Sequence, residues 1–181
     1  RYEKQNGRRD LYDAMKLLCQ AGCEFGTRYA AQARHLLEQS ENTETRRHEL
    51  QKIAETCAQV PAKPARSFME AVQSLWFVFA FTRLCGNWSG IGRIDKMLGP
   101  YLEKDLAENR ITLDEAREIL AHFFIKGCEW IESETPTGSG DAQHYQNIVL
   151  GGLDETGREV TNAVSYLVVD IVEELAIGDF P

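Results

Sequence analysis

The sequence lacks a long apolar run. Its most apolar stretch, Leu75 to Phe81, is far shorter than the roughly 20 residues that a membrane-spanning helix needs. The chain opens on Arg-Tyr-Glu-Lys, which has neither an initiator methionine nor the apolar segment of a signal peptide. We therefore expect a piece of a larger protein without a membrane anchor.

Basic charge is also scarce. Lys and Arg together number 20 against 28 Asp and Glu, which gives a net charge of -8. Nucleic acids and anionic membranes are bound through basic patches, so this balance argues against both kinds of partner. The acidity itself is typical of a soluble globular protein.

Cysteines are few and odd in number: Cys19, Cys23, Cys57, Cys85 and Cys128. Five cysteines scattered through helix-like segments do not suggest a disulfide framework, and they favour a reducing cytoplasm. Cys19 and Cys23 share one face of a predicted helix, but no nearby Cys or His pair completes a metal site. We interpret them as small buried apolar residues and predict no metal.

The first part of the chain, residues 1–59, is predicted to be helical. A first helix over Asp10–Gln39 carries an apolar face at three- and four-residue spacing, formed by Leu11, Met15, Leu18, Gly22 and Phe25. Close packing against another helix would explain Gly22 and Gly26. Thr43 or Thr45 is expected to cap a second helix that runs to about Ala58.

The prolines of Val60–Pro64 break this pattern. Ser67 and Glu70 then have the spacing of a capping box that starts a helix from Phe68 to about Leu84. That helix is apolar on most sides, so we predict that it is buried all round. Since 181 residues have difficulty covering it, other segments of a larger protein are expected around it.

The rest of the chain is predicted to be helical with one short strand. The expected elements are a helix over Arg93–Asn109 interrupted near Gly99-Pro100, a helix capped by Thr112 and Glu115 that runs to about Ile131, a strand over Tyr145–Leu150, a turn at Asp154–Gly157 and a helix over Ala163–Leu175.

Three glycines punctuate the turn from Gly86 to Arg93. They permit positive φ angles and close backbone approach. The turn lacks the Gly-Lys-Ser/Thr ending of a phosphate-binding loop, and no strand precedes it as a dinucleotide site requires. On the residues alone, it is either a packing device between helices or part of a site.

An ordered set of residues runs through the chain from Cys57 to Pro181. Its members are Val60-Pro61, Pro64-Ala65-Arg66, Phe68, Glu70-Ala71, Gln73, Trp76-Phe77, Gly92-Arg93, Asp95, Pro100-Tyr101, Asp105-Leu106, Ile111-Thr112, Glu115-Ala116, Lys126, Gln146-Asn147, Leu150-Gly151-Gly152, Gly157-Arg158, Thr161-Asn162 and Ser165-Tyr166-Leu167. The set resembles the pyruvate formate-lyase domain of glycyl radical enzymes. Residues 60–181 match best, and residues 1–181 would form part of one such domain.

The resemblance implies an α/β fold, in which this chain is a mainly helical segment of a ten-stranded barrel around a dry active site. It implies an anaerobic enzyme that cleaves a C–C, C–O or C–N bond of a small metabolite, either formate acetyltransferase-like or dehydratase/lyase-like. It further implies a stored glycyl radical, a thiyl radical on a cysteine, activation by a radical SAM enzyme and a homodimer.

Both radical-bearing motifs are expected beyond Pro181, so the isolated segment is predicted to be inactive. Gly22-Cys23-Glu24 and Gly127-Cys128-Glu129 are superficially similar to the family's cysteine motif. In both, the Glu follows the Cys directly instead of one residue later. We therefore predict no catalytic residue within this segment.

The resemblance also implies that the residues after Gly86 approach the substrate. They are small in the formate acetyltransferase branch and often His-Ser in the diol dehydratase branch, whereas this chain has Asn87 and Trp88. Trp88 would narrow the cavity or stack on a planar substrate, and Asn87 could hydrogen-bond a carbonyl or hydroxyl. Alternatively, Trp88 packs into the core and Ser89 faces the substrate.

Arg93 and Asp95 are interpreted as structural residues that pair with each other or bond turn carbonyls. A different class of function also remains open. The chain could be a non-catalytic helical interaction or structural domain derived from such an enzyme.

Overall fold

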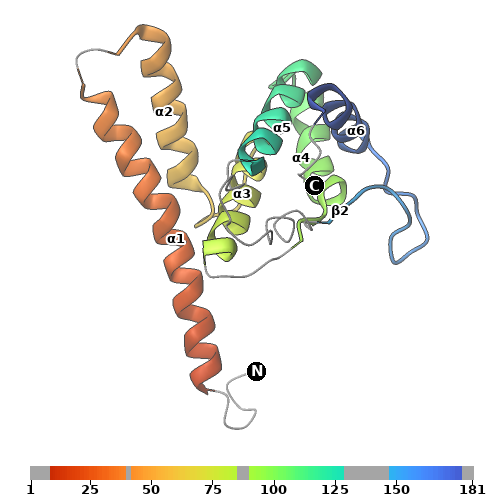
Figure 1. The fold of residues 1–181 in the computed structure, drawn as a ribbon, viewed down its shortest axis with the longest axis horizontal. Coiled ribbons are helices and arrows are strands. Elements are labelled where there is room, and N and C mark those ends of the chain that lie inside the picture. The colour runs from red at the N-terminus through yellow and green to blue at the C-terminus, as the bar shows by residue number, and fades with distance from the viewer. Residues whose placement is uncertain (1–8, 40–41, 85–89, 129–146, 177–181) are drawn as a thin grey trace, which may run out of the picture. The chain divides into compact units, whose positions relative to one another are not determined.

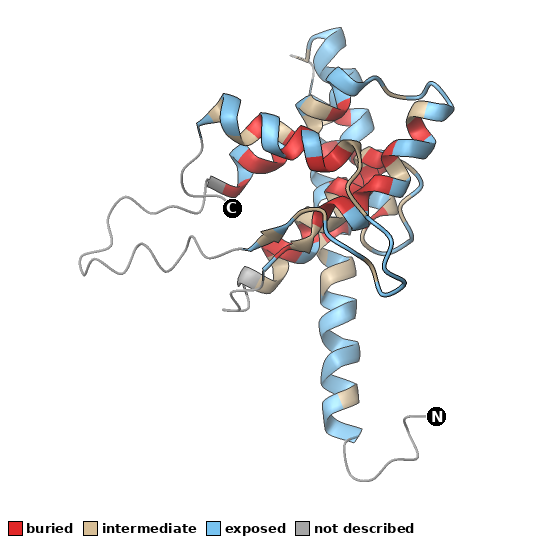
Figure 2. Cartoon of the chain, turned by 90° about the vertical axis from the view of Figure 1, so that its right-hand side faces the viewer, coloured by how far each residue is buried: buried red, intermediate tan, exposed pale blue. Residues whose placement is uncertain are grey.

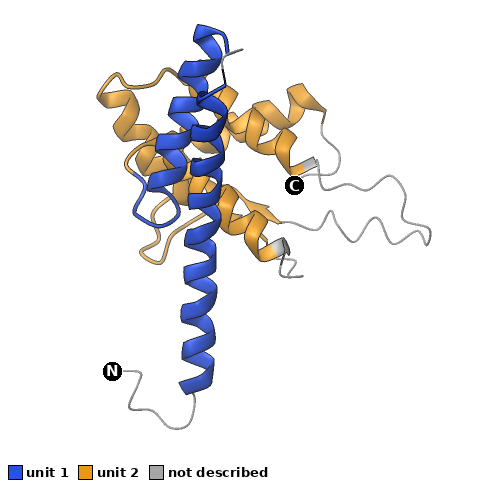
Figure 3. Ribbon diagram, turned by 90° about the vertical axis from the view of Figure 1, so that its left-hand side faces the viewer, with its two compact units in different colours: residues 1–65 blue, residues 66–181 orange. Residues whose placement is uncertain are grey.

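The computed structural model describes residues 9–39, 42–84, 90–128 and 147–176. The chain divides into two compact units, residues 1–65 and residues 66–181 (Figure 3). Helices dominate both units, as the sequence predicts (Figure 1). No helix among the described residues is both long and apolar enough to cross a lipid bilayer.

Unit 1 is a pair of antiparallel helices, α1 (Arg9–Leu37) and α2 (Glu44–Gln59) (Figure 1). Of the two threonines considered as the cap of α2, it is Thr43 whose Oγ1 accepts a hydrogen bond, from the backbone N–H of Arg46 at 3.2 Å. This bond satisfies one of the N–H groups that a helix start leaves unpaired.

Small residues bring the two segments of unit 1 together. The buried residues of α1 are Gly26, Ala30 and Ala33. A Cβ atom at Gly26 would lie 2.7 Å from Pro61 Cδ and 2.8 Å from the carbonyl oxygen of Val60. The expectation of close packing is therefore confirmed at Gly26. Nearby, burial raises the pKa of the Cys57 thiol to about 11, which keeps it protonated near neutral pH.

The first half of α1 is left uncovered by the described residues (Figure 2). Leu11, Met15 and Leu18 of the predicted apolar face are 51, 54 and 53 % exposed. Cys19 is exposed as well, so its interpretation as a buried residue is wrong for this chain. The physical reason is length: α2 has 16 residues and α1 has 29, so α2 pairs with only part of α1.

In the part of unit 2 that the structure describes, four helices pack together beside a short strand pair. Its helices are α3 (Phe68–Leu84), α4 (Ile94–Ala107), α5 (Leu113–Cys128) and α6 (Ala163–Leu175). Both α4 and α5 contact α3 and α6. The core between them holds large, fully buried side chains: Phe68, Ile94, Leu98, Leu102, Leu120, Phe124 and Ile171.

Two predicted capping boxes start α3 and α5, and one of them is modified. At α5, Thr112 and Glu115 bond each other's backbone N–H groups as predicted. At α3, Ser67 Oγ accepts from Glu70 N–H at 3.3 Å, but the Glu70 carboxylate accepts from the backbone N–H of Arg66 at 2.7 Å.

The Arg66 side chain also pairs with Glu70. Burial alone would raise the pKa of the Glu70 carboxyl. The hydrogen bonds from the Arg66 side chain and backbone, together with the Arg66 charge, outweigh this effect and hold that pKa below its ordinary value.

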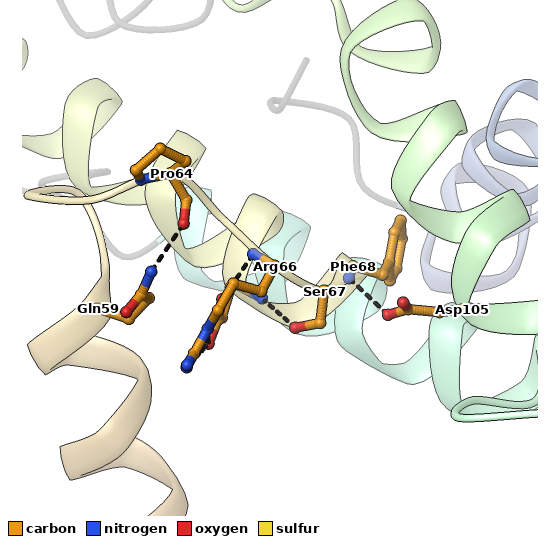
Figure 4. Close-up of polar contacts among 7 residues, drawn as sticks. Gln59, Pro64, Arg66, Ser67, Phe68 and Asp105 are labelled. Carbon is orange, nitrogen blue, oxygen red and sulfur yellow. Dashed lines mark hydrogen bonds and ion pairs between the residues drawn. The ribbon is translucent and has the colours of Figure 1, made fainter. Parts of the chain in front are cut away.

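A second carboxylate secures the start of α3 from another helix. The backbone N–H of Phe68 donates to Oδ2 of Asp105 at 2.7 Å (Figure 4). The other oxygen of Asp105 accepts from the Arg110 guanidinium. Asp105 is buried, so these bonds satisfy a charge that would otherwise be costly inside the protein.

The structure corrects two predicted features of the helices. First, α4 continues through Gly99-Pro100 without interruption, because Pro100 is exposed and the flanking Leu98 and Leu102 are held in the core. Second, α3 is not buried all round by the described residues, since Val78 is 53 % exposed while its neighbours Phe77 and Phe79 are buried.

The strand content is small. β1 (Gly92–Arg93) pairs in parallel with β2 (Ile148–Val149), with Gly92 opposite Ile148 and Arg93 opposite Val149. The predicted strand over Tyr145–Leu150 is thus confirmed at Ile148 and Val149. Asn147 and Leu150 are not part of β2, and Tyr145 and Gln146 lie outside the described residues. Within the described ranges the strands form no closed barrel, so the mainly helical character is confirmed and the barrel is not seen.

The contact at Gly26 yields a first prediction. Replacing glycine by alanine inside a helix ordinarily stabilises it by about 1 kcal/mol. Gly26→Ala should instead lower the free energy of unfolding by about 1–3 kcal/mol, because the new methyl group meets backbone atoms that cannot rotate away. Urea unfolding followed by circular dichroism measures this. Gln32→Ala, at an exposed position of α1, is the control, and a stabilised Gly26→Ala variant would refute the close contact.

Candidate functional site: the anchor of the glycine turn

The three residues predicted to bind substrate, Asn87, Trp88 and Ser89, lie outside the described residues. The structure describes the turn from Gly90 onward, where it joins β1 and α4. This junction is the part of the candidate site that the structure describes.

The end of the turn is paired with the chain that enters β2. The backbone N–H of Gly92 donates to the carbonyl oxygen of Asn147 at 3.0 Å, and Gly92 has a φ of +78°, which favours glycine. A Cβ atom at Gly90 would lie 3.4 Å from the same carbonyl oxygen. Gly92 therefore serves the turn through its positive φ, whereas a Cβ atom at Gly90 would make only an ordinary van der Waals contact with residue 147.

Asp95 joins three segments at the first turn of α4. Its side chain is fully buried, and its Oδ2 accepts from the backbone N–H of Gly151 at 2.5 Å and from Ser165 Oγ at 2.7 Å. Its Oδ1 accepts from the backbone N–H of Lys96 at 2.7 Å. Three donors thus converge on one buried carboxylate, which is what an ionised group needs in order to remain inside a protein.

Arg93 also binds the loop after β2, but through the carbonyl groups of that loop. Its Nη2 donates to the carbonyl oxygen of Gly151 at 2.7 Å, and its Nη1 donates to that of Leu153 at 3.0 Å. Arg93 is thus a structural residue that bonds carbonyl groups, as predicted, but these carbonyls belong to the loop after β2 and not to the glycine turn. Asp95 is also structural, but its partners are N–H and hydroxyl donors, and Arg93 is not among them.

The backbone N–H and C=O groups of Gly151 are therefore both bonded by side chains, those of Asp95 and Arg93. Its N–H goes to the Asp95 carboxylate and its C=O to the Arg93 guanidinium. We call this arrangement the Gly151 clamp. A charged partner on each side makes both bonds stronger than ordinary backbone bonds.

The start of α6 completes the junction. Asn162 is the N-cap of α6: its Oδ1 accepts from Val164 N–H at 2.9 Å, and Ser165 Oγ accepts from Asn162 N–H at 3.1 Å. Asn162 Nδ2 also donates to the backbone carbonyl oxygen of Asp95 at 3.0 Å. Gly99 makes room for this amide, since a Cβ atom there would lie 2.5 Å from Asn162 Nδ2.

No role is assigned to Asn162 or Ser165 from the sequence apart from their place in the family resemblance. Their spacing, an Asn followed three residues later by Ser at the start of an apolar helix, is a capping signal that could have indicated the N-cap. Nothing in the spacing indicates that the same two side chains also bind Asp95, which is 67 and 70 residues away along the chain.

The loop from Gly152 to Val160 is folded on itself. The Asp154 carboxylate accepts from the hydroxyl and N–H of Thr156 and from the N–H of Arg158, as expected for the predicted turn. Its pKa is lowered chiefly by the hydrogen bond from the Thr156 side chain. Val160 N–H returns to the Gly152 carbonyl oxygen at 3.0 Å, which closes the loop beside the Gly151 clamp.

In chemical terms, this junction holds and orients the chain. Asp95 uses its carboxylate oxygens on internal donors, so it is not a free acid or base. Among the described residues, no group of three His, Cys, Asp or Glu side chains could hold a metal ion. Cys23 belongs to the Gly-Cys-Glu sequence that is superficially similar to a cysteine motif, and it lies in the middle of α1.

Comparisons with known proteins place this geometry in context. Residues 2–178 match the model of the pyruvate formate lyase-like family. The chain is 36% identical over 167 residues to isethionate sulfite-lyase of Nitratidesulfovibrio vulgaris, covering 88% of this chain and 20% of that protein. It is 32% identical over 185 residues to trans-4-hydroxy-L-proline dehydratase of Clostridioides difficile, covering 95% and 22%.

Among solved structures, a glycyl radical enzyme from Archaeoglobus fulgidus superposes with a TM-score of 0.74 at 35% identity, covering 87% of this chain and 21% of that one. The chain thus spans about a fifth of the length of the relatives that it matches. The family match begins at residue 2, so it includes α1 and α2 as well as unit 2.

The Gly151 clamp generates a second prediction. Gly151 and Gly157 both have positive φ, at +64° and +79°, so alanine is strained at either position. A Cβ atom at Gly151 would also meet Thr161 Oγ1 at 2.9 Å, whereas nothing lies within 4 Å at Gly157. Gly151→Ala should therefore lower the free energy of unfolding by about 1–2 kcal/mol more than Gly157→Ala, as overpacking typically costs.

Chemical unfolding of the two variants measures this difference. Adding Thr161→Ala to Gly151→Ala should recover part of the loss, because it removes the atom in the way. Equal destabilisation by the two glycine replacements would contradict the close approach at Gly151.

Proposed function

The chain belongs to the pyruvate formate lyase-like family, and on that premise we propose that it is part of a glycyl radical enzyme that removes a group from a small metabolite by elimination. The observation that carries this proposal is the match over residues 2–178 together with the names of its relatives, a lyase and a dehydratase. Such names favour elimination over the acyl transfer of a formate acetyltransferase.

The radical chemistry belongs to the rest of the protein. A glycyl radical and a cysteine, held in segments outside this chain, would supply the abstraction of a hydrogen atom. A radical SAM activating enzyme would be the partner that generates the radical, and the full-length protein would be a cytoplasmic homodimer. This chain would contribute one wall of the cavity and the residues that support it.

Within that wall, Asn87, Trp88 and Ser89 are the residues we propose to face the substrate. Asn87 offers a hydrogen-bonding amide, Trp88 a flat apolar surface and Ser89 a hydroxyl. The anchor of the glycine turn supports this proposal, because it holds the residues that follow directly, Gly90 to Arg93, by bonds to Asn147, Gly151 and Leu153. A wall residue can select substrates only if its backbone is held in place.

The proposed reaction can be tested on the full-length protein. We expect that anaerobic treatment with its radical SAM activating enzyme yields the electron paramagnetic resonance signal of a glycyl radical. Isethionate and trans-4-hydroxy-L-proline, the compounds in the relatives' names, are the first substrates to assay, followed by a panel of small hydroxylated acids and amines. If no radical forms under conditions that activate a known family member, the non-catalytic alternative is favoured.

Trp88→Ala in the full-length protein separates a pocket role from a core role. A pocket role predicts a shift in kcat/KM toward larger substrates by about tenfold or more at unchanged stability, since even one methylene group is worth that much discrimination. A core role predicts a loss of about 3–5 kcal/mol in stability, as for other buried Trp side chains. Trp76→Ala is the matched control, because Trp76 stacks edge-on against Phe123 inside unit 2 and should change stability without changing preference.

A further inference from the structure

α4 carries a buried carboxylate near each end. Asp95 lies in its first turn and Asp105 in its last, and both are almost completely buried. Each accepts a backbone N–H from a distant segment: Asp95 from Gly151, 56 residues away, and Asp105 from Phe68, 37 residues away. The two residues are thus chemically alike but hold different parts of unit 2.

Asp95 holds the loop that follows β2. β2 pairs with β1, and β1 lies shortly after the proposed substrate wall, residues 87–89, in the chain. Gly92 and Arg93 form β1, which pairs with Ile148 and Val149 of β2. Gly151 follows β2 within two residues, and its N–H donates to Asp95 while its C=O accepts from Arg93. A shift of Gly151 would therefore break both bonds at once and release β2 from β1.

The position of β1 in turn fixes the end of the turn. The N–H of Gly92 bonds the carbonyl oxygen of Asn147, the residue directly before β2. Because pairing in a strand ladder is set residue by residue, a slip between β1 and β2 would move every residue that enters β1 from the turn. Ser165 and Asn162 add bonds from α6 to Asp95, so the carboxylate cannot easily move by itself.

We propose that Asp95 is a positioning residue for the substrate wall: through the Gly151 clamp it fixes the pairing of β1 with β2, and hence the place where the glycine turn ends. This inference rests on the proposed role of residues 87–89 in substrate binding. Asp95 does not touch the substrate and acts through Gly151, Gly92 and Arg93. Among the described residues, Asp105 bonds the start of α3 and Arg110, and it has no hydrogen bond to β1, β2 or the loop after β2.

The matched pair Asp95→Ala and Asp105→Ala tests the inference in the full-length protein. Hydrogen–deuterium exchange read by mass spectrometry should show exchange at residues 147–152 and 90–93 at least about tenfold faster in Asp95→Ala, because bonds to a charged group are lost. Residues 66–72 should keep the wild-type rate in that variant. In Asp105→Ala the pattern should be reversed, with faster exchange confined to residues 66–72.

If the alanine variants fail to fold, Asp95→Asn and Asp105→Asn replace them. The amide keeps the shape of the carboxylate, but its NH2 group then faces at least one of the donors that the carboxylate had bonded. Ser165→Ala is a milder variant that removes one bond to Asp95 and should give a smaller rise at residues 147–152. Exchange that rises equally throughout unit 2 in Asp95→Ala, or that stays unchanged at residues 147–152, would overturn the proposal.

Turnover gives the readout that a purely structural role would not change. Per radical counted by electron paramagnetic resonance, Asp95→Ala should show a KM for the accepted substrate raised about tenfold or more, and Asp105→Ala should match wild type. Equal KM values for the two variants would show that Asp95 only stabilises the protein. If wild type forms no radical, the proposed function fails, yet the exchange experiment still decides whether Asp95 fixes the end of the turn.

Discussion

The buried carboxylate of Asp95 is the interaction on which unit 2 depends. It brings together the start of α4, the loop after β2 and the start of α6, which are far apart in the sequence. An ionised group in the core is tolerated only when donors surround it, so the three segments must stay in one arrangement. Specificity of arrangement, more than net stability, is what such a buried charge supplies in this unit.

α4 has a central place in unit 2 because it uses carboxylates at both ends and apolar residues between them. Ile94, Leu98 and Leu102 fill the core, while Asp95 and Asp105 take backbone N–H groups of other segments. The apolar residues supply most of the burial energy, which has no direction. The carboxylates supply direction, since each hydrogen-bonds particular donors at defined positions.

The surface of the chain is consistent with its share of the relatives' length. Among the described ranges, the first half of α1 exposes apolar residues such as Met15, and α3 exposes Val78. Helices with an apolar face gain most of their stability from packing, so these faces suit a larger protein in which further segments cover them. The chain spans only about a fifth of the relatives it matches.

The starts of most helices and the family resemblance follow from the order of the residues alone. Caps are local signals, so Thr43, Thr112 and the helix over Ala163–Leu175 could be predicted from neighbouring residues. The family resemblance is also a property of residue order, and the match over residues 2–178 confirms it.

Which distant residues meet, in contrast, depends on how the helices pack. The sequence predicted an interruption at Gly99-Pro100, but packing of Leu98 and Leu102 keeps α4 continuous, and Gly99 serves the approach of Asn162. The partners of Asp95 could not be read from spacing, because hydrogen bonds across 56 to 70 residues depend on how helices pack. Local propensity acts within a few residues, whereas the burial that places Asp95 against Gly151 and Ser165 is a property of the whole unit.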